Sequence, residues 1–170
     1  MAYCGYSLNF GHVNIMKYCN RPFQTVEEMN ETMINNWNNV IKDKDEVYHL
    51  GDFSLVKKEN LRKIRIRLRG KVYLIKGNHD KFSKKDYENF ENVEKIKEIR
   101  YNGKKIVLCH YAMRTWNCSH HGAYHFYGHS HGTLEPYGRS CDVGVDVHNF
   151  RPLHIDEAIR IADENYKLER

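Results

Sequence analysis

Short apolar segments alternate with longer amphipathic segments along this chain. Residues 2–6 and 46–53 are short and apolar and predict strands. Residues 25–41 predict a helix packed on the core, because their apolar side chains recur at helical spacing. Thr25 and Glu28 have the spacing of a capping box, which places the beginning of that helix at Thr25.

The same alternation continues to the end of the chain. A helix closed by Gly70 is predicted over 58–70, and a hairpin that turns at residues 102–103 is predicted over 93–111. The remaining elements are strands over 71–80, 123–130 and 141–148 and a closing helix over 156–168. Because strands and helices are interleaved and one strand pair is antiparallel, the pattern predicts an α/β fold with a mixed sheet or with two sheets.

Length and composition indicate one globular domain over residues 1–170. The net charge of +5 is modest, and much of it lies in the basic segment 57–71. Such a segment is usually a solvated helix face, and nucleic-acid binding through it is the less common alternative.

The five cysteines have no C-x-x-C spacing and their count is odd, which favours reduced thiols in a cytoplasmic protein. No apolar stretch approaches the length of a membrane span, and the beginning of the chain lacks the pattern of a signal peptide. We therefore expect an intracellular protein that does not bind a membrane.

Polar residues follow four of the predicted strands. They are, in chain order, Gly51-Asp52, Gly77-Asn78-His79-Asp80, His110 and Gly128-His129-Ser130-His131. Because ligand sites of α/β folds collect at the carboxyl ends of strands, we expect these side chains at one edge of the molecule. The two histidines of the last motif are two residues apart, which on an extended segment points both to the same side. A mixed set of oxygen and imidazole donors suits Mn²⁺, Fe or Zn²⁺ better than Ca²⁺.

The order of these motifs, GD, GNHD, H and GHSH, resembles that of the calcineurin-like metallophosphoesterases. The resemblance covers nearly the whole chain, and residues 14–23, 48–54 and 142–153 resemble the small, cap-less branch found in bacteria and phages. It implies two facing mixed β-sheets flanked by helices, a four-layer sandwich, with two divalent metal ions between the sheet ends. It also implies a phosphodiesterase or phosphatase that attacks phosphorus with a hydroxide held by the metals.

The resemblance further implies a role for each motif residue. Asp52 would bridge the two metals, and His131 would serve one of them. The other metal would take its remaining ligands from Asn78, His110 and His129. His79 would protonate the leaving group as a general acid, and Asp80 would orient His79. Mn²⁺ is the favoured ion, with Fe, Zn²⁺ and Ni²⁺ as alternatives.

The beginning of the chain departs from the family pattern. Ser7 stands where the family has its first Asp, and Asn9 stands where the family has the following His. Both positions belong to the site that His131 serves, so Asn9 remains there only as a weak oxygen ligand and this site is weak or empty. Three explanations are open. One metal is tight and the other is recruited with substrate, or the protein binds phosphate or nucleic acid without turnover, or its beginning differs from that of an active parent.

Two further residues are candidates for substrate binding. His12 follows the altered motif, and Arg114 comes shortly after His110 and carries a guanidinium, which suits a phosphate. Packing is the alternative for His12, and a surface ion pair is the alternative for Arg114. The expected substrate is a small phosphate ester or a nucleotide, with nucleic acid as a further alternative, for a monomer or a homodimer.

The predicted strand 141–148 carries polar side chains at alternate positions. They are Asp142, Asp146 and His148. We expect one face of this strand to meet something polar, and the sequence assigns these residues no role.

Overall fold

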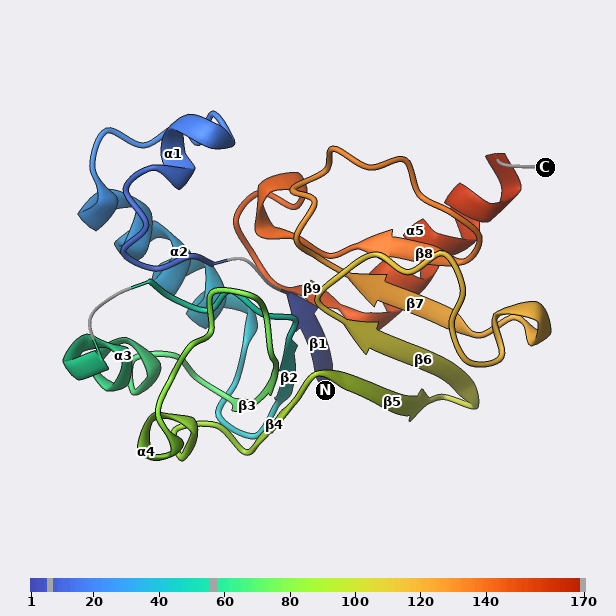
Figure 1. Ribbon diagram of the computed structural model, residues 1–170, viewed down its shortest axis with the longest axis horizontal. Helices are drawn as coiled ribbons and strands as arrows, with labels where there is room; N and C mark the ends of the chain where they lie inside the picture. The colour runs from blue at the N-terminus through green and yellow to red at the C-terminus, as the bar shows by residue number, and fades with distance from the viewer. Residues whose placement is uncertain (6–7, 56–57, 169–170) are drawn as a thin grey trace.

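The strands form two mixed sheets (Figure 1), and side chains of both sheets meet in one of the hydrophobic cores. The computed structural model describes residues 1–5, 8–55 and 58–168. In the larger sheet the strand order is β4–β3–β2–β1–β9, with β1 to β4 parallel and β9 antiparallel to β1. Its strands are β1 (Ala2–Gly5), β2 (Glu46–His49), β3 (Lys71–Ile75), β4 (Asn92–Glu94) and β9 (Leu153–His154).

The smaller sheet has the order β5–β6–β7–β8, and only its first pair is antiparallel. Its strands are β5 (Ile96–Tyr101), β6 (Lys104–Cys109), β7 (Tyr124–Tyr127) and β8 (Ser140–Asp142). The predicted hairpin turn is confirmed, because Asn102 and Gly103 have φ values of 47° and 78°, as a two-residue hairpin loop requires. The predicted α/β fold with two mixed sheets is also confirmed.

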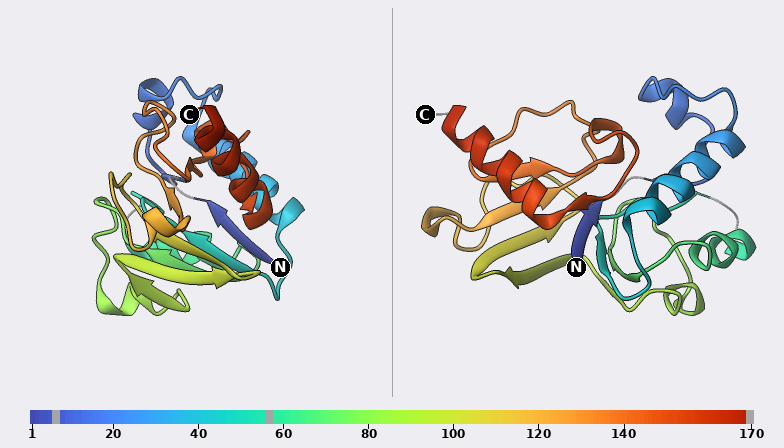
Figure 2. Two further views of the ribbon diagram at one scale, coloured as in Figure 1. Left: turned by 90° about the vertical axis from the view of Figure 1, so that its right-hand side faces the viewer. Right: turned by 180° about the vertical axis from the view of Figure 1, so that it is seen from behind.

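The helices lie on both sides of this pair of sheets (Figure 2). They are α1 (Ile15–Tyr18), α2 (Val26–Val40), α3 (Lys58–Arg65), α4 (Lys84–Tyr87) and α5 (Ile155–Leu168). The first four lie beside the larger sheet, and α5 packs against β1, β7 and β8. None of the described helices is long and apolar enough to cross a membrane.

Neighbouring side chains of the central strands enter two different cores. Val47 of β2 belongs to a core with Trp37 of α2 on one face of the larger sheet. The next residue, Tyr48, belongs to a second core with Phe126 of β7 and Ile159 of α5. Because both faces of the larger sheet are covered, residues 47–48 of β2 and 72–75 of β3 are apolar on both sides instead of alternating with polar residues.

The helix α2 begins where the sequence predicts it. Thr25 Oγ1 accepts the backbone N–H of Glu28 at 3.1 Å, which is one half of a capping box. The other half is displaced by one residue, since the Glu28 carboxylate accepts the N–H of Gln24 at 2.8 Å. Glu28 therefore still satisfies one free amide at this helix end.

The predicted end of the helix over 58–70 is wrong. The helix α3 ends at Arg65, whose guanidinium donates to the carbonyl oxygens of Leu68 and Gly70, each at 2.8 Å. These two hydrogen bonds hold residues 66–70 in a turn. Gly70 therefore shapes the entry into β3 and does not close the helix.

The predicted strand over 141–148 is also wrong beyond its first residues. β8 ends at Asp142, and a 3₁₀-helix, η2 (Val145–Val147), follows. The Asp142 carboxylate accepts the backbone N–H of Gly144 at 2.8 Å, which turns the chain out of the sheet. Asp142 and Asp146 therefore do not share the face of one strand.

Candidate metal centre

The four polar motifs follow strands whose carboxyl ends meet. β2 and β3 are parallel neighbours in the larger sheet, and β6 and β7 are parallel neighbours in the smaller one. The side chains that follow these strands are Asp52, Asn78, His110 and His129. One donor atom from each of Asp52, His110 and His129 lies within 4.8 Å of the others. The structure therefore brings these sequence-predicted residues together from both sheets.

Two glycines let the loops of this centre touch. Gly51 has φ +94°, and a Cβ added there would lie 2.6 Å from Gly77 N and from His110 Nδ1. A Cβ added at Gly77 would lie 2.6 Å from Asp52 N. Since real Cβ atoms keep at least normal contact distances, a side chain at either glycine would separate Asp52 from His110.

Asp80 ties the loop after β2 to the loop after β3. Its carboxylate is fully buried, with Oδ2 accepting the N–H groups of Asp52 at 2.8 Å and Gly77 at 2.9 Å. Oδ1 accepts the N–H of Phe53 at 2.9 Å. Burial raises the pKa of Asp80, although the three amides oppose that shift. Among the described contacts this carboxylate does not bind the ring of His79, so the structure gives Asp80 a different task from the one the resemblance implies.

The imidazole of His110 lies at the middle of the converging donors. Its Nδ1 is 2.8 Å from the carbonyl oxygen of Leu50, which can only accept, so Nδ1 carries the proton. In the neutral ring Nε2 is then an acceptor. It faces Asn78 Oδ1 at 2.9 Å, His129 Nδ1 at 3.1 Å and Asp52 Oδ2 at 3.5 Å.

This arrangement fits a divalent cation. Lone pairs of an imidazole, an amide oxygen and a carboxylate meet, and a positive ion between them relieves their repulsion. Ligands about 2.1 Å from an ion lie about 3.0–3.4 Å from one another, which matches the separations around His110 Nε2. Burial and the neighbouring His110 lower the pKa of His129, which favours the neutral ring that a metal requires. The oxygen and imidazole donors suit Mn²⁺, Fe or Zn²⁺.

The backbone at this edge is strained. Asn9, Asp52, His129 and His131 all have φ between 49° and 67°, a region that residues with a side chain rarely adopt. Such strain collects at functional sites, where the surrounding structure holds it. The expected extended segment at 128–131 is therefore wrong, and left-handed turns bring His129 and His131 to the same cavity.

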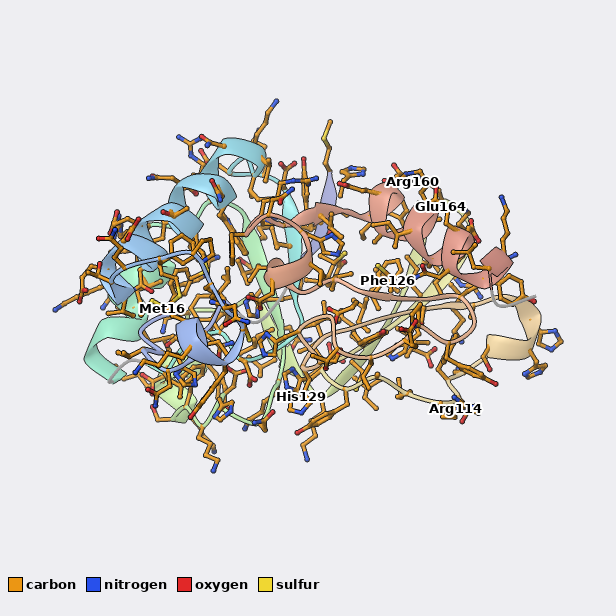
Figure 3. The ribbon with its side chains drawn as sticks, turned by 90° about the horizontal axis from the view of Figure 1, so that it is seen from above. Met16, Arg114, Phe126, His129, Arg160 and Glu164 are labelled. Carbon is orange, nitrogen blue, oxygen red and sulfur yellow. The ribbon has the colours of Figure 1, made fainter. Side chains whose placement is uncertain are left out.

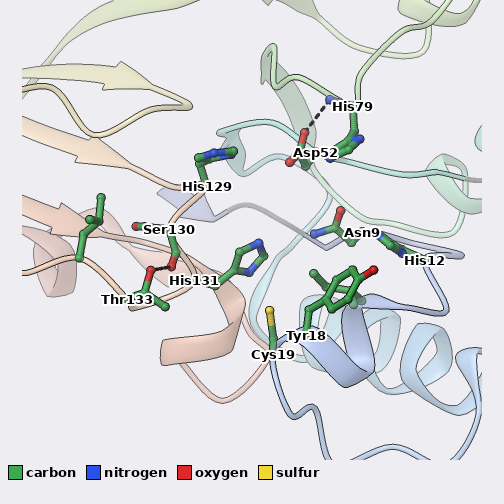
Figure 4. A pocket seen from close by; sticks show the side chains of 12 residues that line it. Asn9, His12, Tyr18, Cys19, Asp52, His79, His129, Ser130, His131 and Thr133 are labelled. Atoms are coloured by element: carbon green, nitrogen blue, oxygen red, sulfur yellow. Dashed lines mark hydrogen bonds between the residues drawn. The ribbon is translucent and has the colours of Figure 1, made fainter.

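A cavity of about 570 Å³ opens beside these residues (Figure 4). Asp52, His79, His129 and His131 line it together with Asn9 and His12. The exposed His79 donates its backbone N–H to Asp52 Oδ1 at 3.0 Å, which fixes its position relative to that carboxylate. The rings of His12 and His79 are 6.3 Å apart, and burial followed by the charge of His79 lowers the pKa of His12.

A second cavity of about 550 Å³ also borders the centre. Its lining includes Asn78, His110 and Tyr111. Three lysines complete its lining: Lys76, Lys81 and Lys95. No ion pair joins any of these lysines to an acidic group in the described part of the chain. This cavity is therefore strongly cationic.

Comparison with known proteins identifies the family. The model of the calcineurin-like phosphoesterase superfamily domain matches residues 29–142. The chain belongs to this superfamily. An uncharacterized protein from Methanocaldococcus jannaschii is 39% identical over 165 residues, which cover 92% of this chain and 88% of the relative. A solved structure from Aquifex aeolicus, of a protein of unknown function, has the same fold with a TM-score of 0.73 and 23% identity, covering 95% of this chain and 98% of that one.

Membership of the calcineurin-like phosphoesterases implies divalent metal ions. Asp52, Asn78, His110 and His129 are the candidate ligands of one ion. His131 lies apart from them, and its Nδ1 is 2.6 Å from Asp146 Oδ2. Ser7 lies outside the described residues. Asn9 is buried and lines the larger cavity together with His131.

Sequence reasoning missed two residues of this calcineurin-like domain. The buried Arg21 donates through Nε to Asp146 Oδ1 at 2.7 Å and through Nη2 to Asp146 Oδ2 at 2.9 Å. Burial opposes ionisation of Asp146, but hydrogen bonds from His131 and Arg21 outweigh it and lower its pKa. The sequence analysis left Asp146 without a role, so this acidic residue between two valines was the available signal.

Arg114 does not lie where the sequence analysis expected it. Its guanidinium lies 4.0 Å from the ring centre of Tyr137 and lines a separate cavity of about 490 Å³. Figure 3 shows Arg114 well away from His129. The chain leaves His110 through a loop that carries Arg114 toward Trp116, so nearness in sequence does not become nearness in space.

Several charged side chains of the basic segment 57–71 form hydrogen bonds within the protein. Arg65 caps a turn, as described above. Arg67 forms a two-pronged ion pair with Glu31, at 2.6 and 2.7 Å, and Arg69 donates to the carbonyl of Asn38 at 3.2 Å. These contacts favour a structural role for the arginines over contact with nucleic acid.

Proposed function

We propose that this chain is a metal-dependent phosphoesterase that hydrolyses phosphate monoesters or diesters. The observation that carries the proposal is the convergence of acceptor atoms on His110 Nε2, at the edge of an open cavity. When bound, divalent ions supply positive charge to the phosphoryl oxygens and lower the pKa of water. We propose Mn²⁺ as the resident ion, because the ligand set contains oxygen and nitrogen and no thiolate.

The protein's own residues position and protonate the substrate. Asp52 and Asn78 present oxygens from the two loops that Asp80 ties together. His79 is exposed to the cavity and held beside Asp52 by its own backbone, so its ring can give a proton to the leaving oxygen. An acid placed in this way is typically worth 10²- to 10⁴-fold in rate.

The lysine-lined cavity supports a nucleotide or another substrate with more than one anionic group. A phosphorus atom at the centre would border both cavities, so the two sides of a diester would have separate places to go. Lys76, Lys81 and Lys95 would hold the anionic side, and the exposed Tyr111 offers a ring on which a base can stack.

A second candidate function is phosphate binding without turnover. The neutral side chains Ser7 and Asn9, in place of a carboxylate and an imidazole, favour it. The complete four-residue centre and the exposed His79 favour catalysis, so binding alone ranks second.

Hydrolysis of bis(p-nitrophenyl) phosphate with titrated Mn²⁺ tests the proposal. We expect turnover that requires Mn²⁺, that is lost in Asp52→Asn, and that falls about 10²-fold or more in His79→Asn. Arg114→Ala is the matched control, since Arg114 lies in a separate cavity, and it should retain full activity. Absence of turnover at every Mn²⁺ concentration would leave phosphate binding as the function.

A further inference from the structure

Three donor groups from separate segments meet outside the four-residue centre. Cys19 directly follows α1, His131 belongs to the loop after β7, and Asp146 lies in η2. One donor atom from each lies within 4.8 Å of the other two. Cys19 and His131 also line the cavity of about 570 Å³, so an ion held by them would face the substrate (Figure 4).

We propose that Cys19, His131 and Asp146 form a zinc site that supplies the second metal of the phosphoesterase. Thiolate, imidazole and carboxylate are the three side-chain types that bind Zn²⁺. The fourth position would face the cavity, which leaves it open for water or a phosphate oxygen. The proposal deepens the proposed function and rests on it only for the use of the ion, since binding itself needs no turnover.

The contacts around Asp146 explain how the site accepts an ion. His131 Nδ1 and Asp146 Oδ2 are 2.6 Å apart, a distance held by one shared proton. Ligands of a tetrahedral Zn²⁺ lie about 3.3–3.7 Å apart, so the ion would replace that proton and the two groups would separate slightly. Sγ of Cys19 would approach by a rotation of its side chain.

The buried Arg21 completes the charge of this site. It holds Asp146 in place through two hydrogen bonds, and Nη1 of the same guanidinium donates to the carbonyl oxygen of Leu8 at 3.1 Å. A zinc ion, a thiolate and a carboxylate together are neutral, and Arg21 makes the set positive. This net positive charge next to the cavity would attract an anionic phosphate.

This site would compensate for the departure at the beginning of the chain. Ser7 and Asn9 are neutral and remove two strong ligands from the family's second metal position. Cys19 and Asp146 bring two anionic ligands to His131 from another direction. The second site would then favour a softer metal ion than the first site, which has no thiolate ligand.

Absorption spectra of the Co²⁺-loaded full chain test the site directly. Co²⁺ replaces Zn²⁺ in such sites, and a cysteine ligand produces a thiolate-to-cobalt charge-transfer band in the near ultraviolet. We expect the band in the wild type and in the matched control Cys118→Ser, and we expect its loss in Cys19→Ser. In Asp146→Asn we expect Co²⁺ affinity about 10- to 100-fold or more below the wild type.

Thiol modification gives a second readout that needs no spectrum. Zn²⁺ should slow the alkylation of Cys19 at least tenfold, as read by peptide mass mapping, and should leave the alkylation of Cys118 unchanged. A charge-transfer band that persists in Cys19→Ser, or equal alkylation of Cys19 with and without Zn²⁺, would overturn the proposal. Hydrolysis without the band would refute this site alone, and the band without hydrolysis would refute only the proposed function.

Discussion

Replacing Asp80 by Asn separates the two tasks considered for this residue. The structure makes Asp80 the tie between two loops, because its carboxylate accepts three backbone N–H groups. In Asp80→Asn the amide oxygen can still accept from Asp52 and Gly77. The new NH₂ group would then face the N–H of Phe53, so two donors would meet in a buried place.

The expected cost follows from these contacts. One charge-assisted hydrogen bond is lost, worth about 1.5–3 kcal/mol, and a buried amide is left without an acceptor at a further cost of about 1–3 kcal/mol. The neutral amide costs less free energy to bury than the carboxylate, and this difference offsets part of the loss. We expect the free energy of unfolding to fall by about 3 kcal/mol, which lowers Tm by about 6–12 °C in a domain of this size.

Denaturant unfolding of Asp80→Asn beside His79→Asn is the assay. His79 is exposed, so its replacement should change stability by less than about 0.5 kcal/mol. Mn²⁺ affinity should fall about 10- to 100-fold in Asp80→Asn, because Asp52 and Asn78 lose their fixed separation. Equal unfolding midpoints for Asp80→Asn and the wild type, with only kcat reduced, would refute the loop-tying role and favour orientation of His79.

Three further outcomes are expected. Gly51→Ala should destabilise the protein by about 3 kcal/mol and abolish Mn²⁺ binding, since its Cβ would lie 2.6 Å from His110 Nδ1; a folded variant that binds Mn²⁺ normally would contradict this. Burial lowers the pKa of His49 to about 3 and of His125 to about 4, so the unfolded chain binds more protons below pH 6.5. The free energy of unfolding should therefore fall as pH drops from about 6.5 toward 4, by up to about 1.4 kcal/mol per pH unit for each histidine, and a flat profile would count against it. Changing Lys76, Lys81 and Lys95 to Gln should raise KM for a dinucleotide substrate at least tenfold and spare kcat, whereas an unchanged KM would remove the lysine cavity from substrate binding.

The fold was predictable where local pattern and long-range packing agree. The helix α2 and the hairpin β5–β6 have strong periodicity and a turn of defined chemistry, and both are confirmed. The strand 141–148 failed because its alternation of polar residues also fits a turn followed by a 3₁₀-helix. The Asp142 carboxylate accepts the backbone N–H of Gly144, and this hydrogen bond favours the turn. The periodicity of apolar and polar residues does not reveal such a bond.

The candidate site was predictable where each ligand follows a strand. The strand topology alone brings four ligands to one edge: Asp52, Asn78, His110 and His129. The motifs that follow these strands were therefore sufficient to predict the centre. Cys19 and Asp146 reach His131 through loops and a short helix, and the placement of loops depends on contacts that the sequence does not display. The same limit explains Arg114, whose loop leads away from the centre.

The most direct test of the account is anomalous X-ray diffraction from crystals of the full chain grown with Mn²⁺. We predict an anomalous peak within about 2.3 Å of donor atoms from Asp52, Asn78, His110 and His129, and the loss of that peak in His110→Ala. A well-ordered structure without a peak among these four residues at saturating Mn²⁺, or with Mn²⁺ bound only elsewhere, would contradict the account.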